Sequence, residues 1–280
     1  IYNLHQHWID LTIYKINRLD FNITYACNLA CKGCISLSDF DRRGVESLQS
    51  IQIQCDNWHE RLQPRIIALF GGEPLMHPHI HDVIEKIRQS WPEATLRLIT
   101  NGYLLKKHDP EIWFNYEPLE IQVSIHRQDH EAIITEQIKR IIECRSGWKT
   151  SKTTDGGHKQ LQLSREGFKI YKSKFGNFVI PYNTGLTPFN SDPKGAHSIC
   201  GSPATPVLYK NRLYKCPPIA NLLDMKPGYV DYAGVGHNED LDEFVNGIGK
   251  PENVCAMCPE SRKHNFDHYA EENVHVKSFS

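Results

Sequence analysis

Short apolar segments alternate with amphipathic segments of helical length through the first half of the chain. We predict strands over residues 19–25, 65–70, 95–100 and 118–126, and helices over 46–62, 79–90, about 129–145 and 239–248. Such alternation is typical of parallel strands joined by crossover helices. In the fourth strand, Gln122, Ser124 and His126 alternate with apolar residues, so they share one face. The sequence therefore predicts an α/β fold.

The second half of the chain is less regular. The segment 147–157 is polar and contains glycine, which predicts a loop and a weak division in the chain. The segment 207–216 is typical of a hairpin that turns near Lys210 and Asn211. Its second strand would end at Cys216.

Charge and composition argue against several classes of partner. The 280 residues include 32 Lys and Arg against 33 Asp and Glu, so no cationic surface indicates binding to nucleic acid or to an anionic membrane. We find no apolar run of about 18 residues and no N-terminal signal peptide. We expect a cytoplasmic protein that acts on a small molecule or a peptide. Because the first residue is Ile1 rather than Met, we expect that the natural N-terminus is trimmed or missing.

Nine cysteines are distributed unevenly along the chain. The first group is Cys27, Cys31 and Cys34, and the second group is Cys200, Cys216, Cys255 and Cys258. Cys55 and Cys144 stand alone in predicted helices, where we expect buried thiols. The chain is too long and too poor in cysteine for a disulfide-stapled scaffold. Three thiols plus four therefore predict two metal centres.

The first group, C-N-L-A-C-K-G-C, brings three thiolates together directly after a predicted strand. Soft thiolates favour zinc, copper(I) or iron–sulfur centres. A structural zinc ion normally has four protein ligands. A cubane held by three cysteines instead keeps one iron without a protein ligand, and that iron is free to bind a substrate or cofactor. The open position indicates a catalytic centre.

This motif resembles that of the radical S-adenosylmethionine (SAM) superfamily, whose hallmark is CxxxCxxC after the first strand of a partial (β/α)6 barrel. The resemblance implies a [4Fe-4S] cluster at Cys27, Cys31 and Cys34, with SAM as a further cofactor. It also implies reductive cleavage of SAM to methionine and a 5′-deoxyadenosyl radical, which takes a hydrogen atom from the substrate. A reductant such as flavodoxin or ferredoxin would supply the electron.

Further motifs extend this resemblance. G-G-E-P at 71–74 resembles the turn that contacts the SAM amino group, where we attribute the glycines to close approach of the methionine moiety. T-N-G at 100–102 resembles a contact to the ribose. Gly33 stands before the third cysteine, at a position where family members often have an aromatic residue. The resemblance thus implies cofactor contacts by Gly33, Gly71, Gly72, Glu73, Pro74, Thr100, Asn101 and Ser124.

Histidines at two places in the sequence are candidates for a functional role. His126 ends a predicted strand, where catalytic groups gather in barrels, so it is our candidate acid–base catalyst, with a cavity histidine as the alternative. The run H-P-H-I-H at 77–81 invites a metal site. Exposed histidines beside a proline at a helix start explain this run adequately.

The second cysteine group resembles the auxiliary-cluster module called twitch, a shortened SPASM module built from a hairpin and a helix. The resemblance implies a second [4Fe-4S] cluster with four cysteine ligands, no open iron and a role in electron transfer. A structural zinc site with four cysteines is the alternative. We accordingly divide the chain into a radical SAM barrel, residues 1–190, and a small α+β module, residues 191–280.

The auxiliary cluster indicates a substrate radical that loses an electron. Compact twitch enzymes include an aminocyclitol dehydrogenase, so the leading hypothesis is an oxidoreductase that modifies a small polar metabolite such as a sugar, cyclitol or nucleoside. Modification of a ribosomally made peptide and epimerisation are alternative reactions. An iron–sulfur electron carrier and a zinc-binding scaffold are the non-enzymatic alternatives.

Overall fold

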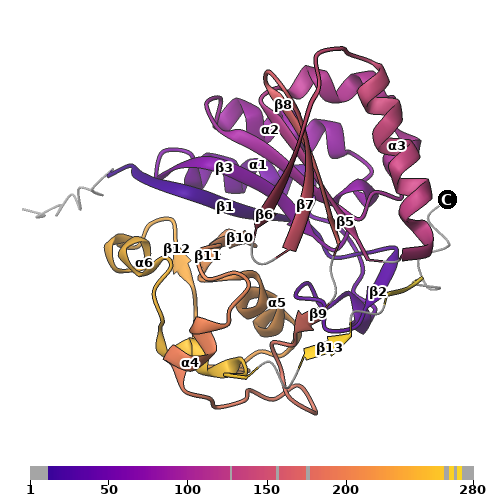
Figure 1. The fold of residues 1–280 in the computed structure, drawn as a ribbon. Coiled ribbons are helices and arrows are strands. Elements are labelled where there is room, and N and C mark those ends of the chain that lie inside the picture. The colour runs from indigo at the N-terminus through magenta and orange to yellow at the C-terminus, as the bar shows by residue number, and fades with distance from the viewer. Residues whose placement is uncertain are drawn as a thin grey trace, which may run out of the picture.

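A mixed sheet forms the centre of the protein, which we describe from a computed structural model over residues 12–126, 128–155, 158–174, 177–261, 265–267 and 270–272 (Figure 1). In these residues the sheet has ten strands in the order β12-β11-β10-β1-β3-β4-β5-β8-β7-β6. They are β1 (Tyr14–Thr24), β3 (Leu62–Gly71), β4 (Thr95–Thr100), β5 (Leu119–Ile125), β6 (Lys149–Asp155), β7 (His158–Arg165), β8 (Phe168–Lys174), β10 (Val207–Tyr209), β11 (Arg212–Tyr214) and β12 (Val235–Gly236).

The middle of the sheet is parallel. Each strand in the run β10-β1-β3-β4-β5-β8 pairs in parallel with the next strand of that run. The strands β11, β12, β7 and β6 extend the two ends of this run with antiparallel pairs. This arrangement confirms the predicted α/β fold with a largely parallel sheet. The partial (β/α)6 barrel implied by the resemblance stays a prediction.

Helices and short strands complete the described part of the chain. The α-helices are α1 (Leu48–Trp58), α2 (Ile80–Ser90), α3 (Glu131–Glu143), α4 (Pro193–Ser198), α5 (Pro217–Met225) and α6 (Asp242–Gly247). The 3-10 helices are η1 (Ser38–Phe40), η2 (Pro74–Met76), η3 (Leu105–Lys107), η4 (Pro110–Tyr116), η5 (Gln128–His130) and η6 (Asn253–Met257). The short strands are β2 (Leu29–Cys31), β9 (Asn177–Val179), β13 (Asn265–Asp267) and β14 (Ala270–Glu272). Within the described ranges, no helix combines the length and apolar character that crossing a membrane requires.

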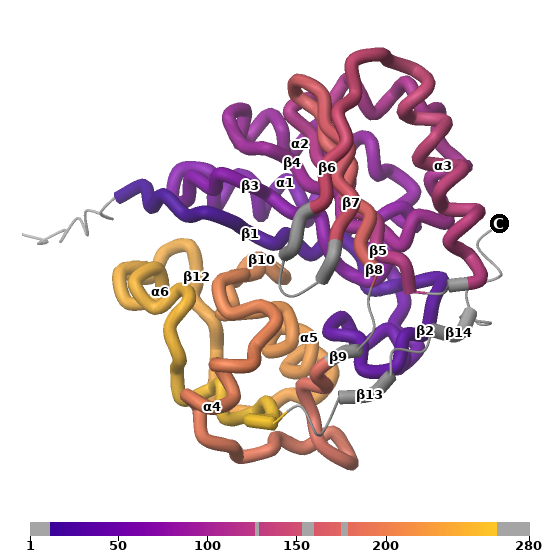
Figure 2. Tube along the Cα trace, in the orientation of Figure 1, coloured from indigo at the N-terminus to yellow at the C-terminus, as the bar shows by residue number. Residues whose placement is uncertain are grey.

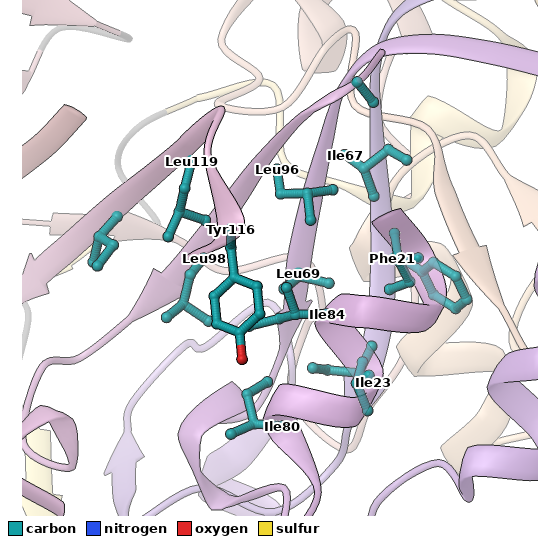
Figure 3. Packing of buried hydrophobic residues seen from close by; sticks show 14 of the residues in the cluster. Phe21, Ile23, Ile67, Leu69, Ile80, Ile84, Leu96, Leu98, Tyr116 and Leu119 are labelled. Atoms are coloured by element: carbon teal, nitrogen blue, oxygen red, sulfur yellow. The ribbon is translucent and has the colours of Figure 1, made fainter. Parts of the chain in front are cut away.

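The main apolar core lies between one face of the sheet and the helices α1, α2 and α3 (Figure 3). Alternate strand residues point into this core, including Leu19, Phe21 and Ile23 of β1, which are fully buried. The intervening positions of β1 carry polar side chains on the opposite face. This alternation directs the helices to one face and leaves buried polar groups on the other.

Local sequence explains why α1 packs as it does. The Ser47 hydroxyl accepts a hydrogen bond from the Ser50 amide and so caps the N-terminus. Ile51, Cys55 and Trp58 then recur at helical spacing and are all fully buried. The burial predicted for Cys55 is thus confirmed.

The four strands and four helices predicted from periodicity are present, with ends that differ by a few residues. The loop predicted over 147–157 is wrong in large part, because β6 occupies Lys149–Asp155 and pairs with β7. Polar residues are compatible with a strand here because β6 forms an edge of the sheet. Cys144, at the end of α3, is half-buried rather than buried.

The predicted hairpin is also confirmed. β10 and β11 pair antiparallel, and the turn residues Lys210 and Asn211 have φ values of 47° and 64°. β10 also pairs in parallel with β1, so this hairpin extends the main sheet. The division of the chain at residues 190 and 191 stays a prediction.

Two isoleucines of α1 provide a matched test of this core. Ile51 is fully buried, whereas Ile53 is 47% exposed. Ile51→Ala is expected to lower the free energy of unfolding by about 2–5 kcal/mol, because it leaves a cavity. Ile53→Ala, which makes the same change on the same helix, should stay within about 0.5 kcal/mol. Urea unfolding followed by circular dichroism measures both, and equal effects would contradict this packing.

Candidate functional site

The first cysteine group lies just beyond the carboxyl end of β1. Cys27 follows that strand, Cys31 ends β2, and Cys34 lies in the next turn. Cys27 and Cys31 are buried, Cys34 is half-buried, and none forms a disulfide. The three thiols belong to one packed cluster with Leu29 and Tyr103, and burial raises the pKa of the Cys31 thiol. The structure thus brings together the three residues grouped by the sequence.

Hydrogen-bond donors surround the sulfur of Cys27. The Leu29 amide donates to it over 3.4 Å, and Nδ2 of Asn101 lies 3.9 Å away. Nδ2 of Asn101 also donates to Oδ1 of Asn28 over 2.7 Å. Donors near a sulfur favour its thiolate, which is the form that binds metals. Asn101 therefore contacts the cysteine loop directly.

A buried carboxylate links the ends of β3 and β4. Glu73 is 1% exposed and accepts hydrogen bonds from the Thr100 hydroxyl (2.6 Å), the Asn101 amide (2.7 Å) and the Leu75 amide (3.0 Å). Burial raises the pKa of Glu73 to about 7, although these hydrogen bonds act in the opposite direction. Glu73 thus fixes the turn from which Asn101 reaches Cys27. The SAM contacts expected from these residues stay predictions.

Gly71 and Gly72 lie against the end of β1. A Cβ atom on Gly71 would lie 2.1 Å from the carbonyl oxygen of Thr24, and one on Gly72 would lie 2.2 Å from that of Ala26. The sequence analysis attributed these glycines to close approach of SAM. In the structure the chain's own backbone already requires them, because any larger residue would push the two strand ends apart.

The remaining SAM-site candidates surround the same strand ends. Pro74 is buried at the start of η2, and the Gly33 amide donates to Oδ2 of Asp39 over 3.2 Å. Ser124 is 5% exposed on β5, and His126 follows that strand and is half-buried. The cofactor contacts and the catalytic role of His126 stay predictions.

In the histidine run at 77–81, His79 is exposed as predicted, but His77 and His81 are not. His77 is 3% exposed and its Nε2 lies 2.8 Å from the Glu46 carbonyl oxygen, and burial lowers its pKa. His81 is only partly exposed, with Nε2 3.0 Å from His108 Nδ1 and Nδ1 3.0 Å from the Tyr116 hydroxyl. These two rings therefore serve packing and hydrogen bonding between elements.

The second cysteine group gathers around α5. Cys200 follows α4, Cys216 is the N-cap residue of α5, Cys255 lies in η6 and Cys258 follows it. All four are half-buried and free of disulfides. Burial raises the pKa of Cys258, and the neighbouring thiols of Cys216, Cys200 and Cys255 raise it further. The structure thus brings these residues together as well.

The donor sets of both groups fit iron–sulfur clusters. Free, mutually close thiols are the ligands that such clusters use, and four thiols also suit zinc. In the part of the chain that the structure describes, no group of three or more His, Cys, Asp or Glu side chains is arranged to hold a metal ion. The fit therefore rests on the chemistry of the donors and not on a preformed coordination geometry.

Sequence reasoning missed two residues near these groups. Asn22 on β1 is 1% exposed, and neither atom of its side-chain amide has a hydrogen-bond partner. The sequence signal for Asn22 is a polar residue between the apolar Phe21 and Ile23 of a predicted strand. Arg42, which follows the first cysteine group, contacts residues more than 160 positions away. Local spacing carries no signal for such contacts.

Comparison with known proteins identifies the N-terminal part. The sequence model of the Radical SAM superfamily matches residues 21–154. These residues form a radical SAM superfamily domain. The matched range contains the first cysteine group, Glu73 and Asn101, and it ends before the second cysteine group.

Curated relatives of this radical SAM domain bear the name GTP 3′,8-cyclase. One from Campylobacter jejuni subsp. doylei is 28% identical over 142 residues, which cover 48% of this chain and 42% of the relative. One from Yersinia pestis is 32% identical over 117 residues, covering 41% and 35%. The match thus spans less than half the length of either relative.

A solved structure resembles nearly the whole chain in fold. The crystal structure of BtrN in complex with AdoMet and 2-DOIA has a TM-score of 0.52 and 12% sequence identity. The likeness covers 93% of this chain and 100% of that one. At this identity the likeness concerns the overall α/β fold alone.

Glu73→Gln is expected to change how folding stability depends on pH. The pKa of Glu73 is raised from 4.5 to about 7 in the folded protein, so folding disfavours the charged form. The contribution of Glu73 to stability should therefore fall by about 3 kcal/mol as pH rises from 4.5 to 7, and stay constant above that. Glu73→Gln should lack this contribution. Urea unfolding of the reduced, metal-free protein across this pH range measures the difference.

The exposed Glu143 provides the matched control. Glu143→Gln should keep the wild-type slope of stability against pH. If Glu73→Gln also kept that slope, the assignment of a raised pKa to Glu73 would be wrong.

Proposed function

We propose that this chain is an enzyme that binds a [4Fe-4S] cluster at Cys27, Cys31 and Cys34 and cleaves SAM reductively. The observation that carries the proposal is the set of three free thiols that pack together inside a radical SAM domain. When bound, the cluster would supply an electron to SAM. Cleavage of SAM would then supply a 5′-deoxyadenosyl radical, which takes a hydrogen atom from the substrate.

The chain's own residues would hold the cluster in one geometry. The Leu29 amide and Nδ2 of Asn101 lie near the Cys27 sulfur, where they would stabilise a metal-bound thiolate. Glu73 keeps Asn101 in place through the Asn101 backbone amide. The burial of Cys27 and Cys31 would limit the access of water to the cluster.

We propose that the second cysteine group holds a second [4Fe-4S] cluster. Four protein ligands would leave no open iron, so its role would be electron transfer. Burial raises the pKa of both Cys200 and Cys216, and the positive charge of Lys215 opposes this effect. Lys215 is 7% exposed and its ammonium group pairs with Glu252, so the part of its charge that is not offset by that carboxylate would favour the thiolates.

We propose that the substrate is a small polar metabolite such as a sugar, cyclitol or nucleoside, and that it is oxidised. Support comes from the sheet face opposite α1–α3. Strand alternation gives this face the buried polar residues Asp20, Asn22, Glu120, Ser124 and Ser173. Asn22 and Ser173 have side-chain atoms without hydrogen-bond partners, so a polar ligand or water would relieve the cost of burying them. BtrN, which shares the fold, was solved with AdoMet and 2-DOIA.

A rearrangement without net oxidation is the second candidate. It is favoured by the curated relatives named GTP 3′,8-cyclase. The two candidates differ in product mass, because an oxidised product lacks a pair of hydrogen atoms whereas a rearranged product is an isomer of the substrate. Mass spectrometry of the product therefore separates them. Epimerisation also gives an isomer of the substrate, so chromatography against the epimers of the substrate is needed to separate it from a rearrangement.

Formation of 5′-deoxyadenosine tests the radical SAM assignment. Anaerobically reconstituted protein is treated with dithionite and SAM, and 5′-deoxyadenosine is measured by liquid chromatography. Cys27→Ala should abolish the product, because the cluster loses a ligand. Cys144→Ala, which changes a cysteine outside both groups, should retain wild-type formation. Failure of fully iron-loaded wild-type protein to make 5′-deoxyadenosine would refute the proposed activity.

Asn22→Leu tests the polar face. In metal-free protein this change should raise the free energy of unfolding by about 1–3 kcal/mol, because it removes an unpaired buried amide. The same variant should lose the stimulation of 5′-deoxyadenosine formation by a metabolite that stimulates wild type. Asn17→Leu, an exposed change on the same strand, should leave that stimulation intact. A less stable Asn22→Leu protein with unchanged stimulation would contradict a ligand-binding role.

A further inference from the structure

The loop that follows Cys34 lies beside the C-terminal part of the chain, which is here residues 177–261 (Figure 2). Leu37 is fully buried in a small apolar cluster otherwise built from residues of the C-terminal part. The other buried members of this cluster are Ile219, Leu222, Tyr229 and Met257, and Cys216 and Cys258 pack against it. The first cysteine loop therefore shares an apolar core with two thiols of the second group.

Arg42 joins the same two parts through polar contacts. Its guanidinium donates to the Tyr209 hydroxyl (2.6 Å), to Oδ2 of Asp224 (2.7 Å) and to Oδ1 of Asn221. It also donates to the Ser36 carbonyl oxygen over 3.2 Å. The Arg42 side chain is 8% exposed, so these contacts are largely shielded from water and salt.

Helix α5 provides the direct connection between the two cysteine groups. Its N-cap residue is Cys216, and it carries both Asn221 and Asp224. Nδ2 of Asn221 donates over 3.1 Å to the carbonyl oxygen of Ile35, the residue that follows Cys34. A single short helix thus contacts the backbone beside Cys34 and begins directly after Cys216, a ligand candidate of the second group.

The loop is strained and depends on these contacts. Leu37 and Asp41 have φ values of 57° and 51°, in the left-handed region that L-residues rarely adopt. Such a conformation persists when surrounding contacts hold it. Leu37 is held by its apolar contacts, and Arg42 fixes the loop one residue beyond Asp41.

We propose that α5 and Arg42 couple the two cysteine sites, so that filling the second site orders the loop of the first. This inference rests on the proposed clusters. A cluster bound at Cys216 would fix the start of α5 and hence the positions of Asn221 and Asp224. By linkage, an ordered first loop would favour filling of the second site by the same factor. Arg42 is in this sense a positioning residue for the first cluster.

Hydrogen exchange in a protein whose first site cannot bind iron tests this coupling. Cys27, Cys31 and Cys34 are replaced by Ala, and the protein is incubated anaerobically with ferrous iron and sulfide. Mass spectrometry then follows exchange of the peptide 35–42, in which the Leu37 and Phe40 amides donate to the carbonyl oxygens of Cys34 and Leu37. Any slowing must arise from the second site. We expect at least about fivefold slower exchange after loading.

Two neighbouring arginines give the matched comparison. Arg42→Met in this background should remove the slowing. Arg43→Met should retain it, because the Arg43 side chain is 60% exposed and pairs with Asp41 on the same loop. Asp224→Asn, which removes one charge from α5, should give an intermediate loss. If circular dichroism shows that Arg42→Met does not fold, Asp224→Asn alone tests the coupling.

Each contrary outcome has a separate meaning. The coupling is refuted, while both clusters stand, if about four irons bind per chain but exchange of the peptide 35–42 is unchanged. It is also refuted if loading slows exchange as much in the Arg42→Met protein as in the Arg43→Met control. If no iron binds in this background, the proposed second cluster fails and the coupling fails with it. If 5′-deoxyadenosine is absent from the wild-type protein although the coupling is measured, only the proposed activity is lost.

Discussion

The buried carboxylate of Glu73 holds the candidate site together. It accepts hydrogen bonds from the turn after β4, and Asn101 in that turn reaches the Cys27 sulfur beyond β1. Neighbouring parallel strands bring these ends to one edge of the sheet. A charge in an apolar setting is costly unless its hydrogen bonds are kept. Glu73 therefore favours a single arrangement of the loops around the first cysteine group.

The C-terminal part is integrated with the radical SAM domain. β10 pairs with β1, and Leu37 from the first cysteine loop fills a core built largely from C-terminal residues. Arg42 adds shielded polar contacts between the same parts. Packing and hydrogen bonding thus connect the surroundings of the two cysteine groups and fix their relative positions.

Much of the fold and of the candidate site follows from local sequence. Apolar periodicity predicted the strands and helices of the first half, and cysteine spacing predicted both thiol groups. Residues 147–157 misled this reasoning because a polar edge strand has the composition of a loop. His77 was expected at the surface, yet its ring is buried against the Glu46 backbone. Composition cannot identify such partners because they come from other elements.

The sequence by itself determined the α/β class and the first group of thiols, because each depends on residues close together in the chain, and the order of its motifs carries the resemblance to radical SAM proteins. The tertiary structure decided that Gly71 and Gly72 are required by the carbonyl oxygens of Thr24 and Ala26, that the Asn22 side chain is buried without hydrogen-bond partners, and that Arg42 reaches α5. These facts depend on which strands become neighbours. The physical reason is that hydrogen bonds and packing act between groups close in space, whatever their separation along the chain.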